Sequence, residues 1–169
     1  MTQRPYRITV VCLGNICRSP IGEAVLADRI QRAGLSTLVE VDSAGTGDWN
    51  VGNAADSRAL STLQAHGYRL AHRARQIDAS WLPEIDLLLA MDVSNYEDLL
   101  RMGPQRHGAA LRMFRSFDPG LSHLSEPSEE LAVPDPYYGS ADGFVDVLAM
   151  IESASDGLVE ELPVLLGRC

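Results

Sequence analysis

The chain has 169 residues, of which 46% are hydrophobic and 22% are charged, and its formal net charge is −9. This length fits one domain over residues 1–169 with room for a sizeable core, and the composition is ordinary for a soluble globular protein. The acidic balance argues against a sequence-general nucleic-acid partner, which needs a basic face. No apolar run approaches the ~20 residues that span a bilayer, so no membrane insertion is expected.

The N-terminal residues and the cysteines indicate the compartment. The first five residues, Met-Thr-Gln-Arg-Pro, contain no hydrophobic signal region, which predicts a cytoplasmic protein. Three cysteines, Cys12, Cys17 and Cys169, do not make a structural disulfide framework. They also lack metal-ligand spacing, and His66 and His72 fall on no obvious ligand face. We therefore expect neither a metal nor another cofactor.

Strand-like apolar runs alternate with helix-like stretches along the chain. In the first helix-like stretch, Ile21, Val25, Leu26 and Ile30 recur at helical spacing. Such alternation favours a parallel sheet covered on both faces. We expect a small, doubly wound, flavodoxin-like α/β fold with four parallel strands and a phosphate-binding loop after the first strand. The expected strands are 7–12, 38–43, 85–91 and 111–114, and the expected helices are 20–33, 56–66, 92–102, 141–153 and 156–166.

Residues 12–19, Cys-Leu-Gly-Asn-Ile-Cys-Arg-Ser, form the most informative segment and directly follow the apolar run 8–11. The backbone N–H groups of such a loop can surround an anion, and the next helix adds the positive end of its dipole. Arg18 can bind two phosphate oxygens with its planar guanidinium. In that field we expect Cys12 to be a thiolate near neutral pH and hence a nucleophile.

The neighbouring residues suit a tight anion-binding loop. Gly14 and Asn15 are residue types that accept a positive φ, which such a loop requires. Ser19 is a favourable helix N-cap, and Pro20 fits the first helical position. Ligands in doubly wound folds bind at the carboxyl ends of strands, and the end of the first strand is where Cys12 lies.

The least regular segment is 115–140, which contains four prolines at positions 119, 127, 134 and 136. Loops of this length without regular structure are usually functional. Two Asp-Pro pairs lie in it, one at Asp118 and one at Asp135. Either aspartate could donate a proton to a leaving group or simply form a turn, and composition and spacing do not separate the two.

The segment Val11–Pro20 resembles the signature loop of the low-molecular-weight protein tyrosine phosphatases. The resemblance runs from about residue 7 to about residue 155 and so covers nearly the whole chain. The further matching blocks are Asp42–Thr46, Trp49 with Gly52, Asp56–Arg58, His66-Gly67 with His72, Met91-Asp92 with Asn95, and Asp135-Pro136-Tyr137-Tyr138-Gly139.

The resemblance implies a phosphatase that hydrolyses phosphotyrosine and other aryl phosphate monoesters through a cysteinyl-phosphate. In that mechanism Cys12 is the nucleophile and Arg18 binds the phosphate and stabilises its transition states. Asp135 matches the family's general acid, which also acts as the base, whereas Asp118 matches nothing catalytic. A tyrosine-phosphorylated protein is the implied substrate, and a monomer is expected.

The resemblance also implies a set of supporting residues. Asn15, Ser19, Ser43 and His72 match a hydrogen-bond network that holds the loop and favours the thiolate. Ser19 additionally matches a donor to Cys12 as the leaving thiolate of the second step.

The same resemblance describes the cleft around the phosphate. Trp49 and Tyr137 match the walls of a slot for a phenyl ring, and Tyr137 and Tyr138 match sites on which a tyrosine kinase acts. The loop residues that match the phosphate and substrate contacts are Leu13, Gly14, Asn15, Ile16, Cys17 and Ser19. Leu13 and Ile16 are the two that offer apolar contacts to the ring.

The oxidation states of the two other cysteines can also be predicted. By resemblance, Cys17 can form a disulfide with Cys12 under oxidation and so protect it from irreversible oxidation. Cys169, at the end of the chain, is expected to be a disordered free thiol.

Other functions compete with this interpretation. A phosphoarginine phosphatase of the same family tends to carry Thr where this chain has Ile16, and an arsenate reductase needs resolving cysteines that 75–95 lacks. A non-catalytic module that binds phosphopeptides stays open as a third alternative. An ATP-binding loop is disfavoured, because no Gly-Lys-[Ser/Thr] follows the glycine.

Overall fold

A four-stranded parallel sheet forms the centre of the molecule in the computed structural model, which describes residues 3–167. The strands are β1 (Tyr6–Cys12), β2 (Val39–Gly45), β3 (Leu87–Ala90) and β4 (Ala110–Met113). Their order across the sheet is β2-β1-β3-β4, so the chain turns back on either side of β1 and β3. This order is that of a flavodoxin-like sheet and confirms the predicted fold class.

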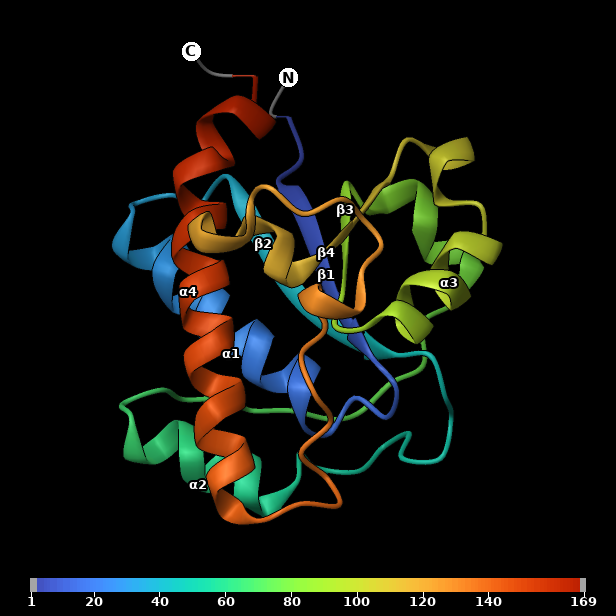
Figure 1. The fold of residues 1–169 in the computed structure, drawn as a ribbon. Helices are drawn as coiled ribbons and strands as arrows, with labels where there is room; N and C mark the ends of the chain where they lie inside the picture. The colour runs from blue at the N-terminus through green and yellow to red at the C-terminus, as the bar shows by residue number, and fades with distance from the viewer. Residues whose placement is uncertain (1–2, 168–169) are drawn as a thin grey trace.

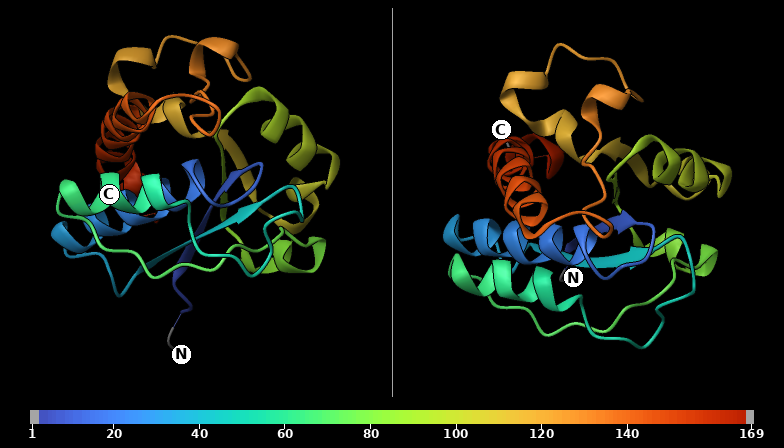
Figure 2. Two further views of the ribbon diagram at one scale, coloured as in Figure 1. Left: turned by 90° about the horizontal axis from the view of Figure 1, so that it is seen from below. Right: turned by 60° about the horizontal axis from the view of Figure 1, so that its bottom comes forward.

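Helices cover both faces of the sheet, as Figures 1 and 2 show. The four α-helices are α1 (Arg18–Arg32), α2 (Ser57–Ala65), α3 (Val93–Arg101) and α4 (Ala141–Leu165). On one face α1 packs against β1 and β2, and α4 packs on α1 with α2 beside them; on the other face α3 packs against β3 and β4. The predicted alternation of strands and helices is therefore confirmed, and both ends of each predicted strand lie within two residues of the observed ends.

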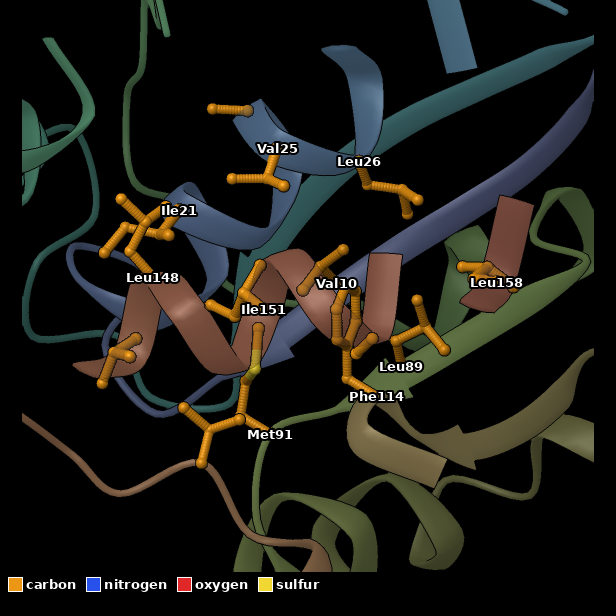
Figure 3. Packing of buried hydrophobic residues seen from close by; sticks show 14 of the residues in the cluster. Val10, Ile21, Val25, Leu26, Leu89, Met91, Phe114, Leu148, Ile151 and Leu158 are labelled. Atoms are coloured by element: carbon orange, nitrogen blue, oxygen red, sulfur yellow. The ribbon is translucent and has the colours of Figure 1, made fainter. Parts of the chain in front are cut away.

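The period of two in β1 divides its side chains between the two faces. Ile8 and Val10 join the larger hydrophobic cluster under α1 and α4, and Val11 joins the smaller one under α3. Figure 3 shows Val10 and Leu89 in the larger cluster, beneath side chains of α1 and α4. Because β3 is buried on both faces, its sequence is a continuous run, Leu-Leu-Leu-Ala, without alternation.

The prediction of two helices at 141–153 and 156–166 is wrong, because α4 is one helix of 25 residues. Gly157 lies inside it and is buried. A Cβ on Gly157 would lie 1.8 Å from the carbonyl oxygen of Phe117. The glycine therefore allows the helix to approach the neighbouring backbone closely and does not end it.

The start of α1 also differs from the prediction. The helix begins at Arg18 and its N-cap is Cys17, so Ser19 is not the N-cap and Pro20 is not the first helical residue. Pro20 is still accommodated, since the first four N–H groups of a helix have no partner within it. The Ser19 side chain points instead toward Cys12 and Asn15.

The segment 115–140 is less irregular than expected. Three short 3-10 helices lie in it or at its start, namely Phe114–Phe117, Pro119–Leu121 and Glu129–Leu131. Its last part returns to the sheet, where the Val133 N–H donates to the Met91 carbonyl at 2.7 Å. Arg115 additionally donates to the Ala132 carbonyl at 3.1 Å. The chain is thereby fixed just before Asp135. Within 3–167, no helix is long and apolar enough to cross a membrane.

Candidate active site

The loop after β1 borders a cavity of about 340 Å³ at the carboxyl end of the sheet. Residues from three separate parts of the chain meet there, namely the loop with the first residue of α1, the segment after β2 and the segment before α4. The lining residues are Cys12, Leu13, Gly14, Ile16, Cys17, Arg18, Trp49, Asn50, Asp135, Tyr137 and Tyr138. All of these except Asn50 are residues that the sequence analysis selected.

Cys12 lies at the base of this cavity, with 3% of its surface exposed. Its Sγ is 3.0 Å from Ser19 Oγ. Asn15 Nδ2 donates to Ser19 Oγ at 2.8 Å and to Ser43 Oγ at 3.0 Å. The network expected among Asn15, Ser19 and Ser43 is therefore present as a set of direct contacts.

The direction of these hydrogen bonds follows from counting donors. Ser43 donates its proton to Glu23 Oε1 at 2.9 Å, so its oxygen accepts from Asn15. Because Asn15 also donates to Ser19, the Ser19 hydroxyl can donate its own proton, and its two acceptors are Cys12 Sγ at 3.0 Å and the Ala44 carbonyl oxygen at 3.4 Å. Burial raises the pKa of the Glu23 carboxyl, while the bond from Ser43 acts in the opposite direction. Glu23 thus ends the network on the side away from the cavity.

Asn15 holds the loop by its backbone as well as by its amide. It is the non-glycine residue of 3–167 with a positive φ, 56°, and the expected positive φ at Gly14 is not observed. A Cβ on Gly14 would lie 2.7 Å from Asn50 Nδ2, so the absence of a side chain at Gly14 leaves room for the Asn50 amide. The Arg75 N–H donates to Asn15 Oδ1 at 2.9 Å.

His72 supports the same residue from a second side. Its Nε2 is 2.6 Å from the Asn15 carbonyl oxygen. A carbonyl only accepts, so Nε2 carries the proton in this contact. Burial lowers the pKa of His72, although this hydrogen bond acts in the opposite direction. The lowered pKa favours the neutral ring. Ser43 and His72 both contact Asn15, and neither lines the cavity.

Arg18 is the buried cation of the site, with 2% of its surface exposed. Its Nη1 donates to Asp92 Oδ2 at 2.7 Å and to the Val133 carbonyl at 3.0 Å. Its Nη2 is 3.5 Å from Asp135 Oδ2. Burial disfavours the guanidinium charge, but the charges of Cys12 and Asp92 outweigh burial and raise the pKa of Arg18. The side chain is therefore held in one orientation by a residue 74 positions away in the sequence.

Asp135 lies at the mouth of the cavity on a loop that is fixed on both sides. Its Oδ1 accepts from the Tyr137 N–H at 3.1 Å. Arg58 donates to the Tyr137 carbonyl at 2.9 Å and is itself paired with Asp56. Asp118, the other candidate acid, accepts from the Gly120 N–H at 2.9 Å and does not line the cavity.

Large side chains form the exposed rim of the cavity. The exposed fractions are 42% for Leu13, 72% for Trp49, 42% for Tyr137 and 92% for Tyr138. The two tyrosine rings meet edge to face, with centroids 4.8 Å apart. The rim is therefore largely aromatic, whereas Cys12, Cys17 and Arg18 are buried beneath it.

Cys17 borders the cavity and is buried, with a free thiol. Burial, followed by the nearby negative charges, raises its pKa to about 12. At neutral pH this thiol is protonated. Cys169 lies outside the described residues.

Several contributors carry no signal in the local sequence. Glu23, Asn50 and Arg75 were missed altogether, whereas Arg58 and Asp92 were noted without a role. Their importance arises from contacts with residues far away in the chain, so no local pattern could have indicated it. Among residues 3–167, no group of three or more His, Cys, Asp or Glu side chains could hold a metal ion.

Fold and loop together define a class of protein, namely a parallel α/β protein with a Cys-x5-Arg phosphate loop after its first strand. The family model described as "Low molecular weight phosphotyrosine protein phosphatase" matches residues 7–164. A "Low molecular weight protein-tyrosine-phosphatase" of Streptomyces coelicolor is 48% identical over 155 residues, which cover 91% of this chain and 92% of the relative.

Solved structures agree with the sequence comparison. A crystal structure of a protein tyrosine phosphatase from Entamoeba histolytica has a TM-score of 0.83 and 34% identity, covering 93% of this chain and 96% of that one. A Drosophila arginine phosphatase also shares the fold, with a TM-score of 0.82, 28% identity and coverage of 92% and 96%. The chain belongs to the low molecular weight phosphotyrosine protein phosphatase family.

Proposed function

We propose that this protein is a protein tyrosine phosphatase that hydrolyses phosphotyrosine and other aryl phosphates through a cysteinyl-phosphate. The observation that carries the proposal is the placement of Cys12, Arg18 and Asp135 around one cavity with an aromatic rim. Family membership supports the same reaction class.

The first step is an in-line attack of the Cys12 thiolate on phosphorus. Ser19 donates to the sulfur, and the loop N–H groups and Arg18 bind the equatorial oxygens of the phosphate. Because Asp92 and the Val133 carbonyl fix one arm of Arg18, its other arm remains directed toward the cavity beside Asp135. The S–P bond forms as the P–O bond to the phenol breaks.

Asp135 donates its proton to the departing phenolate oxygen in that step. In the second step the same carboxylate takes a proton from water, which attacks phosphorus and displaces the Cys12 thiolate. Ser19 then donates to the leaving sulfur. The products are the phenol and inorganic phosphate, and the enzyme returns to its starting state.

The depth and lining of the cavity support an aryl substrate. A phosphate bound by the loop lies at its base, so the attached group must extend past Trp49 and Tyr137 to solvent. A flat ring of phenyl size fits between flat side chains, and Leu13 and Ile16 add apolar contact to it. The shorter side chain of phosphoserine would not carry its phosphate as deep.

The phosphoarginine reaction remains the closest alternative, since an arginine phosphatase has the same fold. Ile16 borders the cavity and offers no polar group to a guanidinium. The arsenate-reductase and pure binding alternatives gain no support from a specific contact.

The decisive experiment measures hydrolysis of 4-nitrophenyl phosphate in the presence of a chelator by the wild type and by Cys12→Ser. We expect metal-independent turnover that is lost in Cys12→Ser, while this variant still binds inorganic phosphate. Cys169→Ser is the matched control and should retain full activity. Substantial turnover by Cys12→Ser would exclude the covalent mechanism, and hydrolysis of phosphoarginine alone would move the assignment to the alternative.

A pair of substitutions tests the acid. Asp135→Asn should slow phenyl phosphate by about 10²–10⁴-fold, the usual contribution of a general acid, and slow 4-nitrophenyl phosphate much less. The reason is that the nitrophenolate leaves without protonation. Asp118→Asn is the control, and the same selectivity in that variant would show that Asp118 is the acid.

We further propose a single-domain, monomeric, cytoplasmic enzyme over residues 1–169. A catalytic thiol next to the free thiol of Cys17 requires a reducing compartment, which supports the cytoplasm. Tyr138, at 92% exposure, is accessible to a tyrosine kinase, and Tyr137 is partly so. Mass spectrometry of the protein purified from its own cells tests this modification, and unmodified Tyr137 and Tyr138 under all growth conditions would count against it.

A further inference from the structure

The segment after β2 is fixed to the phosphate loop by its backbone. The Thr46 N–H donates to the Cys12 carbonyl at 2.9 Å, and the Gly47 N–H donates to the Leu13 carbonyl at 2.9 Å. The positions of residues 46 and 47 are therefore tied to the residue proposed as the nucleophile and to its neighbour.

The indole of Trp49 lies against Gly47. A Cβ on Gly47 would lie 1.8 Å from Cζ3 of Trp49, 2.2 Å from Cε3 and 2.9 Å from Cη2. Contacts shorter than 3.0 Å are essentially never made by real Cβ atoms. The six-membered ring of the indole therefore occupies the space that any side chain at position 47 would need.

This contact matters because most of the Trp49 surface is exposed to solvent. The residue is 72% exposed, yet it lines the cavity above Cys12. An exposed side chain normally samples several rotamers, and fixing it costs conformational entropy. The close approach to the Gly47 backbone, which is itself hydrogen-bonded to the loop, places the six-membered ring of the indole at a defined position relative to the phosphate site.

We infer that Gly47 is a specificity-determining residue, which acts by seating the Trp49 indole as the wall of the aryl slot. The inference rests on the proposed function, since it assumes that an aryl phosphate enters this cavity. With a methyl group at position 47, the nearest indole atom must retreat by at least about 1.2 Å. Because the backbone at residue 47 is held by Leu13, the ring moves and the backbone stays. The phosphate-binding loop keeps its geometry, while the wall of the slot is displaced.

The kinetic test compares the wild type, Gly47→Ala, Trp49→Ala and the double variant with phenyl phosphate and with acetyl phosphate. Aromatic stacking contributes modestly, so Gly47→Ala should raise KM for phenyl phosphate by about three- to ten-fold. The KM for acetyl phosphate and the inhibition constant of inorganic phosphate should change by less than about two-fold, because neither has a ring to place. The double variant should equal Trp49→Ala alone, since Gly47 acts through the indole.

Gly120→Ala is the matched control, because a Cβ there would meet its nearest neighbour, Asp118 Oδ1, at an ordinary 3.4 Å. It should leave all three constants unchanged. An unaltered KM of Gly47→Ala for phenyl phosphate would overturn the inference. Additive effects of Gly47→Ala and Trp49→Ala would do so as well.

A readout without substrate separates this inference from the proposed function. The chain has two tryptophans, so the Nε1–H resonance of Trp49 can be assigned by its loss in Trp49→Ala. That resonance should shift in Gly47→Ala and remain in place in Gly120→Ala. If the wild type hydrolyses neither phenyl phosphate nor acetyl phosphate, the proposed function fails, whereas an unshifted resonance in an active Gly47→Ala overturns only the seating of Trp49.

Discussion

Replacing Ser19 by alanine is the sharpest test of the network around the nucleophile. Ser19 is fully buried, and its oxygen lies 3.0 Å from Cys12 Sγ and 2.8 Å from Asn15 Nδ2. The substitution removes one oxygen atom and leaves the loop backbone in place. It should therefore change the charge stabilisation at Cys12 without removing the phosphate contacts of Arg18.

The expected loss follows from the kind of hydrogen bond. A bond to a charged group contributes about 1.5–3 kcal/mol, which corresponds to about a 10- to 150-fold change in rate. In the proposed mechanism Cys12 regains its charge as the phosphoenzyme breaks down, so this second step should be slowed. The amide of Asn15 also loses one acceptor, and an unsatisfied buried donor costs about 1–3 kcal/mol of folding free energy.

Stopped-flow measurement of phenol release distinguishes the two steps. Ser19→Ala should release a burst of about one equivalent of 4-nitrophenol and then turn over slowly, because the cysteinyl-phosphate accumulates. Ser155→Ala is the control, since this buried hydroxyl has no hydrogen-bond partner within 3–167 and lies in α4. A Ser19→Ala enzyme with the kcat of the wild type would refute the assigned direction of the Ser19–Cys12 bond.

Three further changes have defined outcomes. At neutral pH iodoacetamide should modify Cys12 and spare Cys17, because burial raises the pKa of Cys17 to about 12. Equal labelling of the two cysteines in peptide mass spectra would contradict this. Burial lowers the pKa of His72 below its ordinary 6.5, so the unfolded chain binds a proton that the native ring does not. The free energy of unfolding should therefore fall as the pH drops below about 6.5, by at most ~1.4 kcal/mol per pH unit from this group. Urea titrations at about pH 7.5 and about pH 5 should show a smaller fall for His72→Gln, and an unchanged fall would exclude His72 as its source. In a solvent-exposed helix, a Gly→Ala substitution stabilises the protein by up to ~1 kcal/mol. Gly157→Ala should instead lower the Tm, because its Cβ would clash with the Phe117 carbonyl oxygen. A raised Tm would show that the two backbones separate easily.

The parts of the fold that could be predicted from sequence are those in which local pattern and tertiary packing agree. The run Leu87–Ala90 is apolar on both faces because the strand is central, and the loop from Cys12 to Arg18 is contiguous in sequence. The break expected at 154–155 was wrong, because Ala154 and Ser155 are buried inside one continuous helix, which packs closely against Phe117 two residues later at Gly157. Helix propensity alone cannot report such a contact.

The parts of the site that escaped prediction depend on which strands are neighbours. Asp92 reaches Arg18 because β3 pairs with β1, which puts the ends of both strands at one edge of the sheet. Arg58 and the Tyr137 carbonyl are 79 positions apart in the sequence and meet only after α2 and α4 pack. A local pattern identifies the residue type that chemistry needs, but its partner is set by topology.

The two carboxylates beside Arg18 have different surroundings, and this difference supports the division of labour between them. Asp92 is bound to Nη1 at 2.7 Å and also accepts from the Asn95 N–H at 2.8 Å, so it is fixed as a permanent counter-ion. Asp135 is more distant from Nη2, at 3.5 Å, and lies on the cavity side of the guanidinium. In the proposed mechanism, a phosphate that enters the cavity meets this second arm of Arg18 next to Asp135. Asp135 therefore lies where it can pass its proton to the departing phenolate oxygen of the proposed reaction, while Asp92 keeps Arg18 in position.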